Sequence, residues 1–356
     1  TTVITGNGKL TVSGTATVSS GAEMNVNAAN FSGTVTNNGT ITCGDGAVTF
    51  GETTNSGRIT CSTTTTVFND AVTVSAGGTI KGTTGTAEFK STVTNSGTIT
   101  GGSGAVTFGG NVTNDGEING SSGEITFSGT YGSSTATETT PAKLTASSGN
   151  TNFSSDADFS YTTFNANGGI VLFSSTATTG QKLTLKNNTV SFNEITIQTS
   201  VGRFTAEGTA NGKLIVNTLT LINTNADAIF NIPINAATIE MKNTAETAGA
   251  VTFNNDVTAV TIDNTTTDTS VINFDITFNA ATEVSDVTTP VTFGTTGTLT
   301  LGNNTEDTFI FNGGITHTAG NTTLCGKIIT NSLPVVLSSD ANIKTLTLTG
   351  NSTIQT

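Results

Sequence analysis

The sequence of 356 residues is poor in most of the residue types on which catalysis and nucleic-acid binding depend. Only 10% of its residues are charged, histidine occurs once, cysteine three times, and tryptophan is absent. Lysine and arginine total 12 against 25 acidic residues, so the formal net charge is −13. Because a nucleic-acid binder needs a basic stripe to neutralise phosphates, this balance excludes nucleic acid as a partner. It also disfavours binding to an anionic membrane surface.

Long hydrophobic runs are missing as well. No apolar run approaches the roughly 20 residues that cross a bilayer as a helix, so we expect no transmembrane segment. The first residues, Thr1-Thr2-Val3-Ile4-Thr5, contain neither an initiator methionine nor a signal-peptide pattern. This start is typical of the mature end of a processed chain or of a trimmed fragment. Low charge with abundant threonine, asparagine and glycine favours a secreted protein, extracellular or on the cell surface.

The residues of metal sites and catalytic triads are equally scarce. His317 is the single candidate base, and no acidic residue or cysteine stands near it in the sequence. We therefore predict a surface histidine on a strand. Zinc would need clustered histidines and cysteines. Asp156 and Asp158 could hold a calcium ion weakly with nearby carbonyl oxygens, and otherwise we expect no cofactor.

The bulk of the chain is threonine, asparagine, serine, glycine, valine and alanine. Threonine and valine favour strands, whereas glycine and asparagine favour tight turns. No stretch carries apolar residues at helical spacing, and good helix formers are few. The composition therefore predicts an all-β fold.

A phenylalanine recurs at a near-constant interval in the first third of the chain. The steps are 19, 18, 21, 19 and 19 residues, between Phe31, Phe50, Phe68, Phe89, Phe108 and Phe127. A glycine followed two residues later by isoleucine keeps the same step, as at Gly97 and Ile99. A fixed period in this range signals a solenoid, whose repeats bury their apolar faces only by stacking on neighbours. We predict a single-stranded parallel β-helix (a β-solenoid) of about 19 residues per coil.

The regularity of the repeat divides the chain into three segments. Residues 1–131 form regular coils, 132–170 form an irregular excursion or transition, and 171–356 continue the β-helix with longer strands. We expect one continuous solenoid with a core ladder of stacked rings from Phe31, Phe50, Phe68, Phe89, Phe108, Phe127, Phe173, Phe192, Phe230, Phe253, Phe274, Phe293 and Phe311.

Other residues also recur about once per predicted coil. Asparagine recurs at one corner, at Asn37, Asn55, Asn95 and Asn114. We interpret these asparagines as turn residues that hydrogen-bond the coils above and below, in preference to a binding ladder. Cys43 and Cys61 fall at matching places in adjacent coils, so two buried thiols and a disulfide bridge both stay open. We expect Cys325 to fill the core.

Two activities known for other β-helices receive little support. Carbohydrate-cleaving β-helices gather several acidic groups on one face, but Glu117 and Glu124 have no counterparts in the coils before them. We therefore do not expect an enzyme, and a polysaccharide-active protein stays an alternative. An ice-binding face needs the same threonines in every coil. Charges interrupt both columns that follow the corner glycine, which read Thr40, Arg58, Thr79, Thr98, Glu117 and Thr42, Thr60, Lys81, Thr100, Asn119.

The repeat Val93-Thr-Asn-Ser-Gly97-Thr-Ile99-Thr, with its relatives at Val35 and Val112, resembles a known group. It is similar to the right-handed β-helix shafts of filamentous-haemagglutinin-like adhesins and autotransporter passengers of bacteria. The resemblance covers nearly the whole chain and implies a right-handed coil in a secreted, non-enzymatic protein of the cell surface or matrix. The chain departs from that group because it lacks a recognisable secretion domain.

Two structural roles remain within this class. The first is a fibre subunit that joins copies end to end, because neither terminal segment has a capping element and unpaired strand edges invite pairing. The residues that we expect at such junctions are Val3, Ile4, Leu346, Leu348 and Ile354. The second is a monomeric adhesin stalk that binds glycans or matrix proteins through residues 132–170. We favour the self-assembling fibre.

Overall fold

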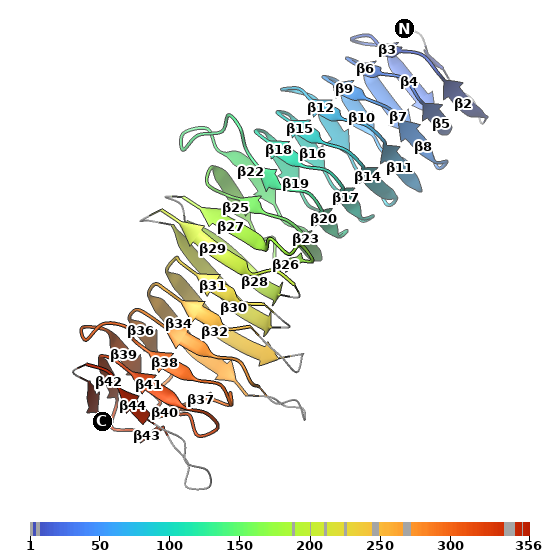
Figure 1. Cartoon of the computed structure of the whole chain (residues 1–356). Coiled ribbons are helices and arrows are strands. Elements are labelled where there is room, and N and C mark those ends of the chain that lie inside the picture. The colour runs from blue at the N-terminus through green and yellow to red at the C-terminus, as the bar shows by residue number, and fades with distance from the viewer. Residues whose placement is uncertain are drawn as a thin grey trace. The chain divides into compact units, whose positions relative to one another are not determined.

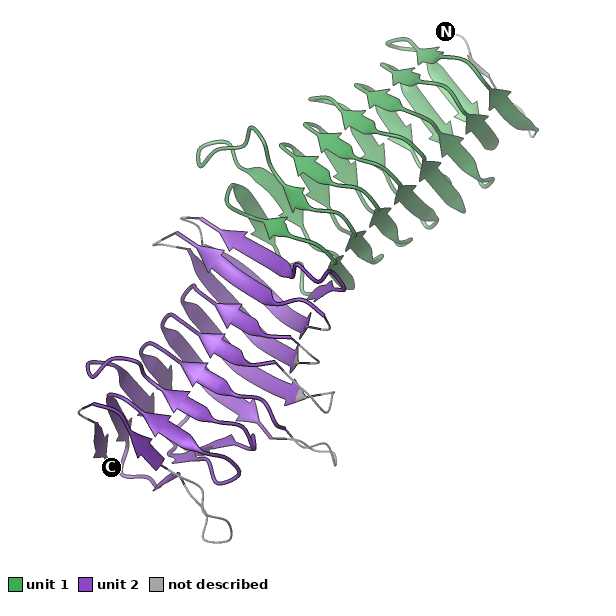
Figure 2. Cartoon of the chain, viewed as in Figure 1, with its two compact units in different colours: residues 1–172 green, residues 173–356 purple. Residues whose placement is uncertain are grey.

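The fold is all-β, as predicted. In this computed structural model the structure describes residues 3–4, 8–186, 189–199, 201–209, 212–223, 226–243, 249–265, 272–337, 346–350 and 352–356. Every regular element in this part of the chain is a strand (Figure 1). Parallel strands stack into a β-solenoid of about 15 turns, with about 21 residues per turn where we had predicted about 19. The chain forms two compact units, Thr1–Leu172 and Phe173–Thr356 (Figure 2).

Unit 1 has three parallel sheets, and each coil gives one short strand to each sheet in turn. Sheet A contains β1 (Val3–Ile4), β4 (Glu23–Val26), β7 (Thr40–Cys43), β10 (Arg58–Thr60), β13 (Thr79–Lys81), β16 (Thr98–Thr100), β19 (Glu117–Asn119), β22 (Ala142–Thr145) and β25 (Thr162–Asn165). Sheet B contains β2 (Lys9–Val12), β5 (Ala28–Phe31), β8 (Val48–Phe50), β11 (Thr65–Phe68), β14 (Thr86–Phe89), β17 (Val106–Phe108), β20 (Ile125–Phe127) and β23 (Asn150–Phe153). Sheet C contains β3 (Ala16–Val18), β6 (Val35–Asn37), β9 (Thr53–Asn55), β12 (Val72–Val74), β15 (Val93–Asn95), β18 (Val112–Asn114), β21 (Tyr131–Gly132) and β24 (Ala157–Asp158). β26 (Ile170–Ser175) contains the boundary between the units.

The three-residue strands follow from the alternation of apolar residues with threonine. In β17, Val106 and Phe108 point inward and are at most 5% exposed, whereas Thr107 faces outward. Pairing keeps equivalent residues opposite one another, so the phenylalanines of sheet B stack. Neighbouring ring centroids are 4.6–5.3 Å apart and the planes lie within 13° of parallel, along Phe31, Phe50, Phe68, Phe89, Phe108, Phe127 and Phe153. The sequence repeat did not predict the last member, Phe153.

Two kinds of turn connect sheet C to sheet A. In the shorter one a buried asparagine closes the turn: Asn95 Oδ1 accepts from the Gly97 amide at 3.2 Å, and Asn95 Nδ2 donates to Asn114 Oδ1 at 2.8 Å. In the longer one valine takes the place of asparagine. After Val74 the turn closes itself, with the Gly78 amide donating to the Ser75 carbonyl at 2.8 Å. The two extra residues explain the step of 21 between Phe68 and Phe89.

The corner glycine that ends each short turn is required by close backbone stacking. A Cβ at Gly97 would collide with the carbonyl oxygen of Gly78 in the preceding coil. Gly116 has the same relation to Gly97. The repeated glycine is therefore a steric requirement of coils that pass within van der Waals contact.

Unit 2 has two sheets at its start, because two faces of the coil are joined in one long strand. The short strands are β27 (Gln181–Leu185), β29 (Phe204–Gly208), β31 (Ala228–Phe230), β33 (Val251–Phe253), β35 (Ile276–Phe278), β38 (Leu299–Leu301), β41 (Thr322–Leu324) and β44 (Leu346–Leu348). The long strands are β28 (Thr189–Thr199), β30 (Lys213–Asn223), β32 (Ile234–Asn243) and β34 (Val257–Asn264).

Beyond β34, two separate series of short strands replace the long strands. The first half of β34 pairs with β36 (Thr282–Val284), which leads to β39 (Thr308–Phe311), β42 (Lys327–Thr330) and β45 (Thr353–Gln355). The second half pairs with β37 (Val291–Phe293), which leads to β40 (Ile315–Thr316) and β43 (Val335–Val336).

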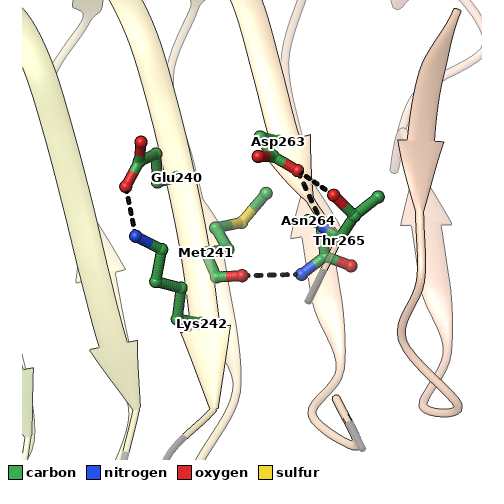
Figure 3. A network of polar contacts seen from close by, with 6 residues as sticks. All are labelled: Glu240, Met241, Lys242, Asp263, Asn264 and Thr265. Carbon is green, nitrogen blue, oxygen red and sulfur yellow. Dashed lines mark hydrogen bonds and ion pairs between the residues drawn. The ribbon is translucent and has the colours of Figure 1, made fainter. Parts of the chain in front are cut away.

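A polar network holds the ends of the long strands (Figure 3). The buried Asn264 donates from Nδ2 to the Met241 carbonyl at 3.1 Å, in the neighbouring strand. The carboxylate of Asp263 accepts from the amide and the hydroxyl of Thr265 at 2.8 and 2.6 Å. On the outer face, Lys242 and Glu240 form an ion pair at 2.6 Å. Asn264 thus joins adjacent coils in unit 2 as the corner asparagines do in unit 1.

The aromatic ladder predicted for the second half differs from the observed one. Successive ring contacts join Phe173, Phe204, Phe230, Phe253 and Phe278. In this ladder Phe204 and Phe278 occupy the positions predicted for Phe192 and Phe274.

The remaining predicted rings of unit 2 face other partners. In the register of the strands, Phe192 lies opposite Val216 and Phe311 opposite Val284. The ring of Phe293 meets that of Phe278 edge-on. Turns of variable length separate the strands here. Residues separated by a constant number of positions in the sequence therefore do not lie on the same face of the coil.

Replacing Phe108 by alanine is expected to lower the free energy of unfolding by about 3–5 kcal/mol, because it opens a cavity inside a stack with rings on both sides. The outward neighbour supplies the matched control: Thr107→Ala should change stability by no more than about 0.5 kcal/mol. Urea unfolding followed by circular dichroism measures both. Equal effects would show that the ring column does not dominate the core.

Gly97→Ala is expected to destabilise the protein by about 1–3 kcal/mol, since the backbone below cannot move away from the new Cβ. Gly14→Ala is the control, because a Cβ there meets no atom within 4 Å. Thermal unfolding of the two variants compares them directly. A Gly97→Ala protein as stable as Gly14→Ala would contradict the close stacking of the corners.

Candidate functional site

The excursion predicted at 132–170 is much shorter in the structure. Four strands within that segment pair in register with the preceding coils, for example β22 with β19 and β23 with β20. Only residues 133–141, between β21 and β22, leave the coil. Equivalent corners in the preceding coils contain two residues, such as Ser96-Gly97, or four, as after Val74. We call residues 133–141 the corner loop.

The corner loop is fastened to the coil before it by one carboxylate. Asp115 Oδ1 accepts from the Ser133 hydroxyl at 2.7 Å and from the amides of Ser134, Thr135 and Ala136 at 2.8, 2.9 and 3.3 Å. Asp115 Oδ2 accepts from the Ser134 hydroxyl at 2.8 Å. Burial alone would raise the pKa of Asp115, but these hydrogen bonds outweigh it and hold the pKa well below its usual range.

Aromatic residues fill the core beneath the loop. Tyr131 is buried and meets Phe127, Phe153 and Phe159 edge-on. Its hydroxyl accepts from Asn114 Nδ2 at 3.2 Å, which ends the asparagine column of unit 1. Burial raises the pKa of Tyr131 to about 12. Residues 152–161 are rich in aromatic residues, and the structure shows that Phe153 and Phe159 of this segment pack against Tyr131.

Beside the corner loop lies a polar hollow of about 280 Å³. Its lining includes Gly77, Ser96, Thr98, Glu117, Pro141 and Lys143. Glu117 and Lys143 stand opposite one another in the register of β19 and β22. Buried asparagines hold the main chain of both: Asn95 Nδ2 donates to the Glu117 carbonyl and Asn114 Nδ2 to the Lys143 carbonyl, each at 3.0 Å. Buried asparagines thus hold the main chain of the two charged residues that line the hollow.

The residues considered for chemistry do not come together. Glu117 lies in sheet A, whereas Glu124 precedes β20 of sheet B. Asp158 accepts from the Ser160 amide at 2.8 Å. The described residues contain no group of three or more histidine, cysteine or acidic side chains that could hold a metal ion. They also contain no helix long and apolar enough to cross a membrane.

His317 is buried, which corrects the surface position predicted for it. Its side chain is 0% exposed, and its Nδ1 lies 2.8 Å from Thr322 Oγ1. Its Nε2 lies 3.1 Å from the Thr295 carbonyl oxygen, which can only accept, so Nε2 carries the proton. Two polar partners inside the coil make burial of this ring tolerable.

The three cysteines are free and buried. Burial raises the pKa of Cys61 to about 12 and that of Cys43 even further. Of the two alternatives, the structure therefore has two small buried thiols. A raised pKa keeps a thiol protonated and unreactive.

The threonine columns are in register, and they differ between sheets. In sheet A the two columns read from the sequence do stack, and charged residues interrupt both. Sheet C carries an uninterrupted column that the sequence repeat had not singled out, Thr17, Thr36, Thr54, Thr73, Thr94 and Thr113. It is one residue wide, because the position two residues earlier includes Glu52 and Ala71.

At β44 and β45, apolar side chains that continue the buried columns of unit 2 are exposed to solvent. Leu348 is 56% exposed, whereas its register partner Leu324 is fully buried. Ile354 is 43% exposed opposite the buried Ile328, and Leu346 is also exposed. At the other end β1 contains Val3 and Ile4, whose side chains lie outside the described residues.

Removing the Asp115 carboxylate should release the corner loop. In Asp115→Ala we expect faster hydrogen exchange at the amides of Ser134 and Thr135, while Asp158→Ala, which removes a single local acceptor, leaves them unchanged. Because the folded pKa of Asp115 is depressed, its contribution is complete above about pH 4 and fades as the pH falls further. Exchange that is independent of both the substitution and acid pH would refute this anchor.

No family model, curated protein or solved structure matches the chain.

Proposed function

We propose that this protein is a non-enzymatic extracellular scaffold whose copies stack end to end into a surface fibre or matrix. The observation that carries the proposal is the exposed apolar cross-section at β44 and β45. Leu346, Leu348 and Ile354 belong to columns whose preceding members are buried. Each of these side chains would lose its exposed area if another parallel strand paired with the free edge.

A second copy is the occupant that we favour, because the opposite end offers matching chemistry. In β2, Leu10 and Val12 are half-buried, whereas their register partners Ala29 and Phe31 are 1% exposed. The columns of inward-facing side chains are therefore partly exposed at this end as well. Pairing between two different ends is a heterologous contact, which does not close on itself and builds an open filament. The weakly charged, threonine-rich outer face agrees with an extracellular setting.

The adhesin stalk remains the alternative, with glycans or matrix proteins as partners. The anchored corner loop and its hollow support it, because binding residues commonly lie on loops held by a rigid scaffold. A monomer in solution would favour this role over the fibre.

The fibre proposal predicts sedimentation that depends on concentration. The purified chain should form assemblies as its concentration rises, and electron micrographs should show them as filaments. The double variant Leu346→Lys, Leu348→Lys should remain monomeric, because each copy would bring two ammonium groups into the junction. Val287→Lys is the matched control, since Val287 is 54% exposed elsewhere in unit 2. A wild-type chain that stays monomeric at high concentration would exclude end-to-end stacking.

A further inference from the structure

The hollow beside the corner loop is built from rigid parts. Its lining includes Gly97 and Gly116, where close stacking on the preceding coil leaves no room for a Cβ. The lining also includes Pro141, at the end of the loop that Asp115 fastens. A volume of about 280 Å³ suits one small molecule or one unit of a longer chain.

The charges at the hollow have capacity for a ligand. The three ion pairs among the described residues lie in unit 2 and involve neither Glu117 nor Lys143. Glu117 Oε1 accepts one hydrogen bond, from Asn119 at 2.7 Å. Asp115, Glu117 and Lys143 together carry one net negative charge, and the whole chain carries −13. A cationic ligand is therefore favoured over an anionic one.

The remaining lining selects for hydroxyl groups. Ser96 and Thr98 supply hydroxyls, and the exposed Lys143 ammonium can donate to a ligand oxygen. No aromatic side chain lines the hollow, so stacking against the face of a neutral sugar ring is not provided. Recognition would depend on hydrogen bonds and on one charge pair.

We propose that the hollow binds a small hydroxylated amine of the amino-sugar class. The ligand ammonium pairs with the Glu117 carboxylate, and its hydroxyl groups exchange hydrogen bonds with Ser96, Thr98 and Lys143. Asn95 and Asn114 position the two charged residues by holding their main-chain oxygens from inside the coil. This site requires no assembly of copies and is independent of the fibre.

Saturation-transfer NMR on the full chain at about pH 6, where such an amine is protonated, tests the proposal with glucosamine, N-acetylglucosamine and glucose as probes. Glucosamine should bind at least about five-fold more tightly than the two uncharged sugars, and added salt should weaken this preference. In Glu117→Gln the preference should disappear.

Glu124→Gln is the matched control, because it removes the same charge from the same coil but outside the hollow lining. It should leave the preference unchanged, and circular dichroism should show both variants folded. Equal binding of charged and uncharged sugars overturns the proposal. So does binding of none of them, or an equal response of Glu117→Gln and Glu124→Gln.

Discussion

Parallel pairing of each coil with the next, in strict register, is the constraint on which the rest of the structure depends. Because a strand in one coil bonds to its counterpart in the next, each residue lies against the residue that holds the same place one turn later. Identical residues are therefore favoured wherever one type stacks well on itself. The phenylalanine column of sheet B and the corner asparagines are direct results.

Polar groups inside the coil are tolerated because neighbouring coils satisfy them. Asn95 bonds to the side chain of Asn114 and to the main-chain carbonyl of Glu117, both in the next coil, so its amide is desolvated without loss of hydrogen bonds. In unit 2 the buried side chains of Asn264 and His317 are also hydrogen-bonded, to main-chain and hydroxyl partners. Where a longer turn closes its own backbone bond, as after Val74, an apolar side chain can replace the asparagine. Turn length and core polarity are thus linked.

The two surfaces that we connect with function are departures from this repetition. At β44 and β45 the columns stop being covered, which leaves Leu348 exposed where Leu324 is buried. At the corner loop, inserted residues fold back onto Asp115 and create a hollow over the otherwise smooth glycine corner. The first surface has the chemistry of strand addition, and the second that of a small polar ligand. Assembly would use β44, β45 and β2, whereas residues of other coils line the hollow, so the two surfaces share no residue.

The sequence by itself determined the all-β solenoid, because the alternation of apolar residues with threonine and the recurring glycine turns are local properties of each coil. It also placed Phe31 to Phe127 in one column, since the turns between them are nearly constant in length. Only the tertiary structure decided that Phe278 rather than Phe274 meets Phe253, because long strands and variable turns change the register. It also decided that His317 is buried and that Asp115 holds a loop about 20 residues further along the chain. Those contacts join residues of different coils, and a count along the sequence cannot reveal them.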